Sequence, residues 1–253
     1  MGPPTIWTLE SSHRLTPRIS LHSFSNTDLS NIALLPSGKV TLQFPPNLDP
    51  ITTLSEDERR LVFTPCRATH DASGRLSSFA FLASNGRVAG LIGLPRQLTA
   101  RLVDVGDGFP SAVLSSRVCV AGGTGIACFL ALGDTRNATL VWSIRGDDFA
   151  IVESFLATKM LDVGRWSSVR VFVTPGEDVD GLAGGKPAAW WQARFETLRA
   201  GGLELRLGRM AQRDLDALLG EGSGDVLFCG SKALEWQVKM WSLGRAVVHC
   251  TER

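Results

Sequence analysis

The sequence has no tyrosine, a net charge of only +1, and no apolar run long enough to cross a membrane. A transmembrane helix needs about 18 consecutive apolar residues, so no membrane span is expected. The near-cancellation of charge gives no general attraction to nucleic acid, which is therefore not expected as a partner. The first residues lack the basic start and the apolar segment of a secretion signal, so a soluble, cytoplasmic protein is expected.

Cysteine and histidine are also few, and their spacing excludes several kinds of site. The five cysteines are odd in number, and no two of them form a CxxC pair. This spacing excludes a zinc site, an iron–sulfur domain and a disulfide framework. The four histidines lie far apart, so no metal ion is expected. The cysteines are Cys66, Cys119, Cys128, Cys229 and Cys250.

The first part of the chain is rich in short segments typical of β-strands. Hydrophobic residues make up 44% of the whole chain, which is enough to build a sizeable core. Turn-forming residues such as Pro, Gly, Asn and Ser separate the segments. This rhythm predicts an antiparallel β-barrel over residues 1–112. The expected strands are residues 18–24, 39–44, 61–64, 77–82 and 100–105.

The second part alternates strand-like and helix-like segments. Such alternation predicts a parallel sheet with helices on both faces, a doubly wound, Rossmann-like α/β domain over residues 113–253. The expected strands are residues 117–121, 138–143, 168–174, 203–207, 225–229 and 246–249. The expected helices are residues 125–132, 147–160, 188–199, 212–219 and 233–243.

A glycine-rich turn, Ala-Gly-Gly-Thr-Gly-Ile-Ala at residues 121–127, joins the first of these strands to the first helix. Glycines let the backbone turn tightly and let a phosphate approach it, while the helix start offers free amide groups. We therefore expect Gly122, Gly123, Thr124 and Gly125 to bind the phosphates of a nucleotide. The spacing is not that of a G-x-G-x-x-G motif, and a tight turn without a ligand is the alternative.

Two later strand ends offer further candidate residues. Cys229 and Gly230 follow the fifth strand, where a nicotinamide could lie, although a cysteine there is also a common core residue. Ser143 and Arg145 follow the second strand and could hold an adenosine ribose or its 2′-phosphate. A solvent-facing loop arginine is the alternative for Arg145.

Taken in order from about residue 38, these pieces resemble the ferredoxin–NADP reductase superfamily, including cytochrome b5 reductase-like enzymes. In that family a flavin-binding β-barrel precedes a nicotinamide-nucleotide domain. Residues 106–109, Gly-Asp-Gly-Phe, are similar to the family's barrel ending, and residues 121–127 to its pyridine-nucleotide turn. Cys229 and Gly230 are similar to its Cys-Gly-Pro motif, with Ser231 in place of proline.

The resemblance assigns flavin contacts to residues of the barrel. It implies that Phe63 stacks on the flavin ring and that Thr64 lies near the flavin N5 atom. The family's arginine that pairs with the FAD pyrophosphate is replaced by Leu61. Arg60 and Arg67 are the nearby substitutes, although strand alternation points Arg60 to the opposite face from Leu61.

Two further motif positions depart from the family pattern. The family's Gly-x-x-Ser turn, which grips pyrophosphate, is most similar to Gly86, Arg87, Val88 and Ala89, so the serine is missing and Arg87 could supply charge instead. Cys128 stands at a helix-end position where the family usually has proline.

The resemblance implies a flavin-dependent oxidoreductase that passes a hydride from NAD(P)H to FAD and electrons on to a small-molecule or protein acceptor. Thr64 and Cys229 are the residues expected at the reacting groups. Arg145 favours NADPH over NADH.

Two other functions stay open. The missing arginine and serine allow a repurposed scaffold, with weak or no flavin binding, that catalyses a non-redox cyclisation or isomerisation of an apolar small molecule. Trp142 and Trp236 would suit such a ligand, although core packing is the more common role of tryptophan. An electron-transfer or regulatory subunit is the third possibility, but no basic docking patch supports it.

Overall fold

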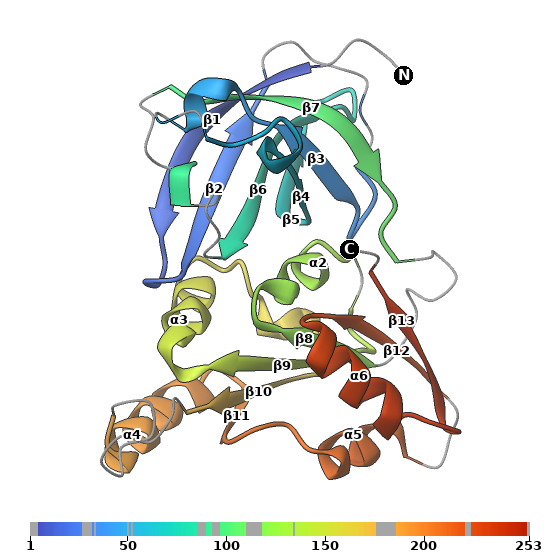
Figure 1. Ribbon diagram of the computed structural model, residues 1–253. Coiled ribbons are helices and arrows are strands. Elements are labelled where there is room, and N and C mark those ends of the chain that lie inside the picture. Colours follow the sequence, from blue (N-terminus) through green and yellow to red (C-terminus); the bar gives the residue numbers. More distant parts are fainter. Residues whose placement is uncertain are drawn as a thin grey trace. The chain divides into compact units, whose positions relative to one another are not determined.

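The computed structural model describes residues 5–26, 32, 34–49, 51, 53–84, 90–92, 97–109, 118–133, 135–175, 186–220 and 224–251. The chain divides into two compact units, the first ending at Gly108 and the second starting at Phe109 (Figure 1). Each unit is built on one sheet. The predicted domain boundary, between residues 112 and 113, lies outside the described residues and stays a prediction.

The first unit is a seven-stranded antiparallel sheet. Its edge strands, β4 and β5, are separated in the chain by Thr64 alone, so the sheet must curl for one to follow the other. The Phe63 ring of β4 stacks on the Phe81 ring of β6 at 3.8 Å between centroids, which brings one edge strand against the strand next to the other edge. The predicted barrel-type, antiparallel fold is confirmed.

The strands run in the order β4-β3-β7-β1-β2-β6-β5. Their bounds are β1 (Thr5–Arg14), β2 (Ile19–Ser25), β3 (Lys39–Gln43), β4 (Arg60–Phe63), β5 (Pro65–His70), β6 (Leu76–Ser84) and β7 (Thr99–Gly106).

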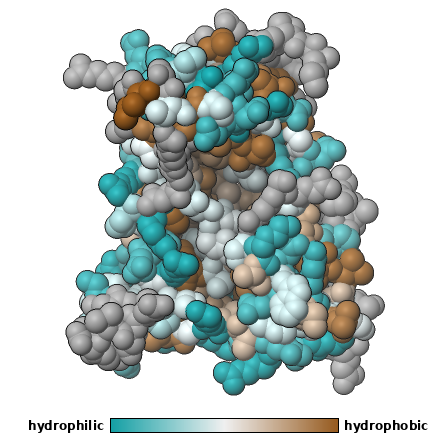
Figure 2. Space-filling model, in the orientation of Figure 1, coloured by the Kyte–Doolittle hydropathy of each residue, from teal (hydrophilic) through white to brown (hydrophobic). Residues whose placement is uncertain are grey.

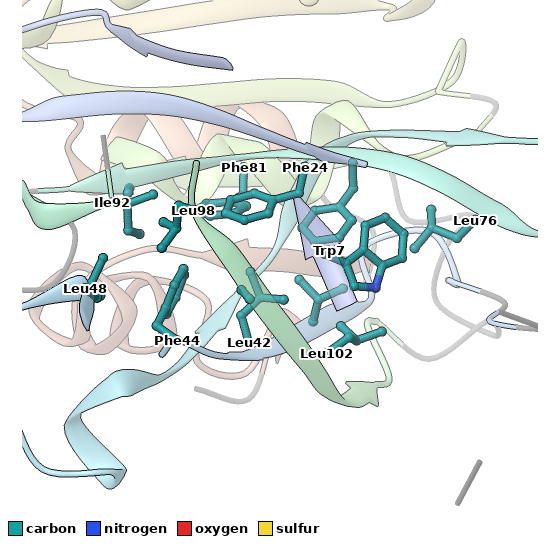
Figure 3. Close-up of a cluster of buried hydrophobic side chains, with 14 of the residues drawn as sticks. Trp7, Phe24, Leu42, Phe44, Leu48, Leu76, Phe81, Ile92, Leu98 and Leu102 are labelled. Atoms are coloured by element: carbon teal, nitrogen blue, oxygen red, sulfur yellow. The ribbon is translucent and has the colours of Figure 1, made fainter. Parts of the chain in front are cut away.

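Aromatic and aliphatic side chains fill the interior of this sheet (Figure 3). Trp7 and Phe24 are fully buried there, and the Phe24 ring stacks on Phe79 and Phe81 at about 6 Å. Strand β1, which supplies Trp7, was not predicted. Most of its residues are polar and exposed, so the strand lacks the apolar alternation that reveals the others.

The second unit is a six-stranded, fully parallel sheet in the order β11-β10-β9-β8-β12-β13. The predicted doubly wound α/β architecture is confirmed. The strands are β8 (Val118–Gly122), β9 (Thr139–Arg145), β10 (Ser168–Thr174), β11 (Leu203–Leu207), β12 (Gly224–Cys229) and β13 (Ala246–Cys250). The helices include α2 (Ala127–Leu130), α3 (Ala150–Ala157), α4 (Ala188–Arg199), α5 (Gln212–Leu219) and α6 (Lys232–Trp241).

Helices cover both faces of this sheet (Figure 1). On one face Leu215 of α5 and Val238 of α6 pack against Val120 and Phe228. On the other face Trp142 of β9 stacks on Phe155 of α3 at 6.1 Å. Burial on both faces explains why inner strands such as β8 and β12 are continuous apolar runs, whereas the edge strand β11 alternates.

The strand order reverses at β8. The chain continues from β8 to β9, β10 and β11 on one side and then returns to β12 and β13 on the other side. Ligands of open α/β sheets bind beyond the carboxyl ends of the strands at such a point. The sheet therefore places its expected ligand site where β8 and β12 end, at Gly122 and Cys229.

Among the described residues, no helix has both the length and the apolar character needed to cross a membrane.

Candidate functional site

The glycine turn follows β8 as predicted. Gly122 ends the strand, a 3-10 turn covers Gly123–Ile126, and α2 continues it for four residues. Gly123 has a φ of +55°, and a Cβ added there would meet no atom within 4 Å. The helix is shorter than predicted, so the site depends on the turn itself rather than on a long helix dipole.

The other glycines of the turn are needed because two backbones approach each other closely. A Cβ on Gly125 would lie 2.1 Å from the carbonyl oxygen of Cys229. A Cβ on Gly230 would lie 3.0 Å from the Cα atom of Gly122. The structure thus brings the glycine turn and Cys229-Gly230 together. Packing alone accounts for Gly122, Gly125 and Gly230, which leaves Gly123 as the glycine with open space beside it.

Trp142 supports the glycine turn. Its side chain is fully buried, and its indole Nε1 donates a hydrogen bond to the Gly123 carbonyl oxygen at 2.9 Å. Trp142 is therefore a structural residue of the site. For Trp236 the alternative interpretation, core packing, is wrong, because this residue of α6 is 66% exposed.

Trp236 is one of several exposed hydrophobic residues near the end of the chain. The others are Met240 on α6, Leu243 just after it, and Val247 on β13. The surface in Figure 2 mixes hydrophilic and hydrophobic residues.

Three thiols lie close to the turn. Cys229 is half-buried at the end of β12, and Thr251 Oγ1 donates a hydrogen bond to its sulfur at 3.3 Å. The fully buried Cys128 donates a hydrogen bond to the Gly125 carbonyl oxygen at 3.1 Å, and its thiol lies near that of Cys229. Burial raises the pKa of the Cys128 thiol well above its usual value, and the neighbouring Cys229 raises it further. Burial likewise raises the pKa of Cys119 to about 12.

The sequence did not predict Cys128 and Thr251 as parts of this site. The one signal for Cys128 was its place at a position where the family has proline. Nothing in the sequence pairs Thr251 with Cys229, because the contact depends on the neighbouring ends of β12 and β13.

Ser143 and Arg145 lie at the end of β9. Ser143 pairs with Gly122 in the strand register, so the structure brings its backbone beside the turn. Arg145 is exposed, and within the described part of the chain its guanidinium makes no hydrogen bond or ion pair. Its charge is therefore available to a ligand.

In the first unit the candidate flavin residues divide between two faces of β4. Leu61 and Phe63 pack against the core, whereas Arg60 is exposed, as strand alternation predicts. Thr64 is half-buried between the edge strands, and Arg67 on β5 is exposed. Gly86, Arg87 and Val88 lie outside the described residues.

These residues fit a flavin only in part. Phe63 is half-buried, but one face of its ring is already covered by Phe81. Leu61, which stands where a cation would meet pyrophosphate, lies against the core instead. Arg60 and Arg67 make no ion pair with any described residue, so both are free to meet a phosphate group from the surface. In the described ranges, no group of His, Cys, Asp or Glu side chains is arranged to hold a metal ion.

Comparison with known proteins finds no match to a protein-family model and none to a curated protein. Solved structures do match. The chain is similar to the ferredoxin reductase in carbazole 1,9a-dioxygenase, with 15% identity over 98% of this chain and 68% of that one, at a TM-score of 0.62. It is similar to the flavohem-like FAD/NAD-binding domain of nitric oxide dioxygenase from Vibrio cholerae O1 biovar El Tor, with 13% identity over 97% and 98% of the two chains, at a TM-score of 0.60.

A third similar structure is a ferredoxin NADP+ reductase from Neisseria gonorrhoeae with bound FAD and NADP. Its identity is 12% over 99% of both chains, and its TM-score is 0.52. At these identities the likeness establishes the fold. The protein has the two-unit fold of ferredoxin reductase-like proteins, and the resemblance predicted from its motifs is confirmed at that level.

Proposed function

We propose that the protein is a flavin-dependent oxidoreductase that passes a hydride from NAD(P)H to FAD and electrons on to a small-molecule or protein acceptor. The juxtaposition of the glycine turn with Cys229 and Gly230 supports this proposal, because it occurs where the strand order reverses in a reductase-like fold. We assign flavin binding to residues 1–112 and NAD(P) binding to residues 113–253.

The nucleotide half of the site is the better equipped. The open backbone at Gly123 and the hydroxyl of Thr124 would bind the phosphates, and Ser143 would contact the adenosine ribose. The free guanidinium of Arg145 would pair with a 2′-phosphate, which favours NADPH. Cys229, half-buried at the end of β12, would form the wall against the nicotinamide.

The flavin half relies on fewer contacts. Phe63 would stack on the flavin ring, and Thr64 would donate a hydrogen bond near its N5 atom. Arg60 and Arg67 would meet the pyrophosphate from the exposed faces of β4 and β5. FAD supplies the electron chemistry when it is bound, and the residues of the chain hold and orient it.

A spectroscopic titration tests this function. Purified protein is mixed with FAD, separated from free flavin, and exposed to NADPH or NADH without oxygen. A retained flavin spectrum that bleaches on addition of the nucleotide is expected. A protein that retains no flavin, or a bound flavin that neither nucleotide bleaches, would overturn the proposal.

A pair of arginine variants tests the nucleotide assignment. Arg145→Ala should raise the KM for NADPH by about tenfold, because a charge-assisted contact to phosphate is lost, and leave the KM for NADH unchanged. Arg213→Ala, another exposed arginine of the same unit, is the matched control and should change neither value.

A second function, a repurposed scaffold with non-redox chemistry on an apolar molecule, is favoured by the position of Leu61 in the core and by the Phe63–Phe81 stack. It predicts protein that purifies without flavin and gives no spectral change with NAD(P)H. The same titration therefore separates the two functions.

A further inference from the structure

Cys128 and Cys229 are far apart in the chain, but both lie against the same residue, Gly125. The backbone of Cys229 lies so close to Gly125 that a Cβ there would be 2.1 Å from the Cys229 carbonyl oxygen. The sulfur of Cys128 lies 3.1 Å from the carbonyl oxygen of the same glycine. The two thiols lie close enough together that Cys229 raises the pKa of the Cys128 thiol. The absence of a side chain at Gly125 is what allows this approach.

The surroundings of the two sulfurs differ. Cys229 is half-buried, and the hydroxyl of Thr251 donates to its sulfur at 3.3 Å. A donor to sulfur stabilises a thiolate, which is the form that reacts with oxidants. Cys128 is fully buried, its sulfur donates to the Gly125 carbonyl oxygen, and the thiols of Cys229 and Cys119 both raise its pKa. Burial keeps it protonated, so it is a poor primary target.

We propose that Cys229 is a site of reversible oxidation and that Cys128 resolves the oxidised sulfur as a disulfide. The oxidant is a hydroperoxide, for which hydrogen peroxide is the simplest example. The Cys229 thiol loses its proton, the thiolate attacks a peroxide oxygen, and the O–O bond breaks. The leaving hydroxide takes up that proton, so the products are a sulfenic acid and water. The Cys128 sulfur then attacks the Cys229 sulfur, the S–O bond breaks, and a second water leaves with the Cys128 proton. Two thiols have lost two electrons, and the peroxide is reduced to water.

The disulfide would tie α2 to the end of β12 beneath the glycine turn. The Cys229 sulfur would be drawn toward Cys128 and could no longer form the wall that meets the nicotinamide. Loss of turnover, regained with a dithiol reductant, is the expected consequence, and this consequence alone rests on the proposed function. The disulfide itself depends only on the two thiols.

Mass spectrometry of the full-length protein tests the disulfide. Protein is treated with hydrogen peroxide, its free thiols are alkylated, and its peptides are mapped with and without dithiothreitol. The expected product is a Cys128–Cys229 cross-link that is lighter than the two reduced peptides by about 2 Da and is cleaved by the reductant. Cys229 oxidised to sulfinic acid without a cross-link, or a cross-link from Cys229 to Cys119 or Cys250, would overturn the proposal.

Variants separate the resolving role from a packing role. In Cys128→Ala, Cys229 should be oxidised to the sulfinic acid at peroxide concentrations at which its oxidation in the native protein is still reversible. Cys128→Ser should behave in the same way and replaces the first variant if that one folds poorly. Cys250→Ala, which removes another half-buried cysteine of the same sheet, is the control and should still form the cross-link. An unchanged Cys229 product in both Cys128 variants would contradict the resolving role.

The two proposals fail in different ways. A cross-linked protein that never bleached a flavin would leave the disulfide intact and overturn the reductase function. A protein that bleaches its flavin with NAD(P)H but never forms the cross-link would leave the reductase function intact and overturn the disulfide. Full turnover by the cross-linked protein would overturn the regulatory consequence.

Discussion

The two units carry their candidate ligand residues in physically different ways. In the parallel-sheet unit the motif is backbone geometry, since Gly122, Gly125 and Gly230 are required for two strand ends to touch. In the barrel unit the corresponding motif consists of side chains. There Leu61 packs against the core, and the exposed side chain of Arg60 makes no ion pair with any described residue.

This difference explains why the two halves of the reductase pattern are unequally complete. Where an added Cβ would clash with a backbone atom, the fold itself requires glycine, whether or not a nucleotide binds. An exposed arginine contributes little to folding, so only ligand binding would require an arginine at that position. The intact glycine turn is therefore stronger evidence for the fold than for the reaction.

The largest effect is expected at Gly125. Gly125→Ala would place a methyl group 2.1 Å from the Cys229 carbonyl oxygen, and backbone on both sides leaves no side chain to move away. We expect a loss of about 3 kcal/mol or more in the free energy of unfolding, or failure to fold. Denaturant unfolding followed by circular dichroism measures this loss.

Gly133→Ala is the matched control, because a Cβ at that exposed glycine would meet no atom within 4 Å. Its stability should change by less than about 1 kcal/mol. If both variants unfold alike, the two strand ends do not touch as described, and the contrast between backbone motif and side-chain motif fails.

A pH effect of nearly the same size is expected in the barrel unit. His22 on β2 is 1% exposed, neither of its ring nitrogens has a hydrogen-bond partner among the described residues, and its ring lies 5.6 Å from that of Phe81. Burial lowers its pKa from 6.5 to about 4. Protonation therefore favours the unfolded state as the pH falls from 6.5 to about 4, whereas above 6.5 the residue has no effect.

Over that window the free energy of unfolding should fall by about 3 kcal/mol, and amide exchange of β2 and β6 should rise before that of β8 and β9. His22→Leu should remove this dependence, while His13→Leu, at an exposed position of β1, should keep it. Equal acid sensitivity of the His22 and His13 variants would show that another group in the barrel unit controls its stability.

The spacing of apolar residues and the positions of turn-forming residues predicted much of this structure. Alternation along residues 60–63 placed Arg60 opposite Leu61, and the change from short strands to alternating strands and helices predicted two sheets of different kinds. Strand β1 was missed because its residues are mostly polar and one buried residue, Trp7, anchors it.

Contacts between distant strand ends were beyond prediction from the sequence. The approach of Gly125 to Cys229 and the meeting of Cys128 with Cys229 depend on the order β8-β12, in which neighbours in space are far apart in the chain. Trp236 was misjudged for a related reason. Helix α6 has two apolar stripes, and its sequence does not tell that the side of Val238, rather than that of Trp236, faces the sheet.

An intermediate effect is expected when the support of the glycine turn is removed. Trp142→Phe deletes the indole hydrogen bond to Gly123 and leaves space beside Phe155. A half-buried carbonyl without its donor and a small cavity together should lower the free energy of unfolding by about 2 kcal/mol. Nucleotide affinity should fall as well, because Gly123 loses its support.

Trp236→Phe, at the exposed tryptophan on α6, is the matched control for Trp142→Phe. It should change stability by no more than about 0.5 kcal/mol. A Trp142 variant with native stability but weak nucleotide binding would show that the ligand, rather than packing, requires this tryptophan.

The smallest effects are expected at the exposed arginines of the barrel unit. Arg60→Ala and Arg67→Ala should each weaken FAD binding, measured by flavin fluorescence titration, by less than about tenfold, because solvent screens a contact made from an exposed strand face. Arg101→Ala, an exposed arginine on β7, should have no effect and serves as the control. A loss well beyond tenfold at either position would mean that the arginine closes over the pyrophosphate as a desolvated, bidentate contact. The barrel unit would then have replaced its missing family arginine from the opposite face of β4 or from β5, and its flavin motif would be as complete as the glycine turn.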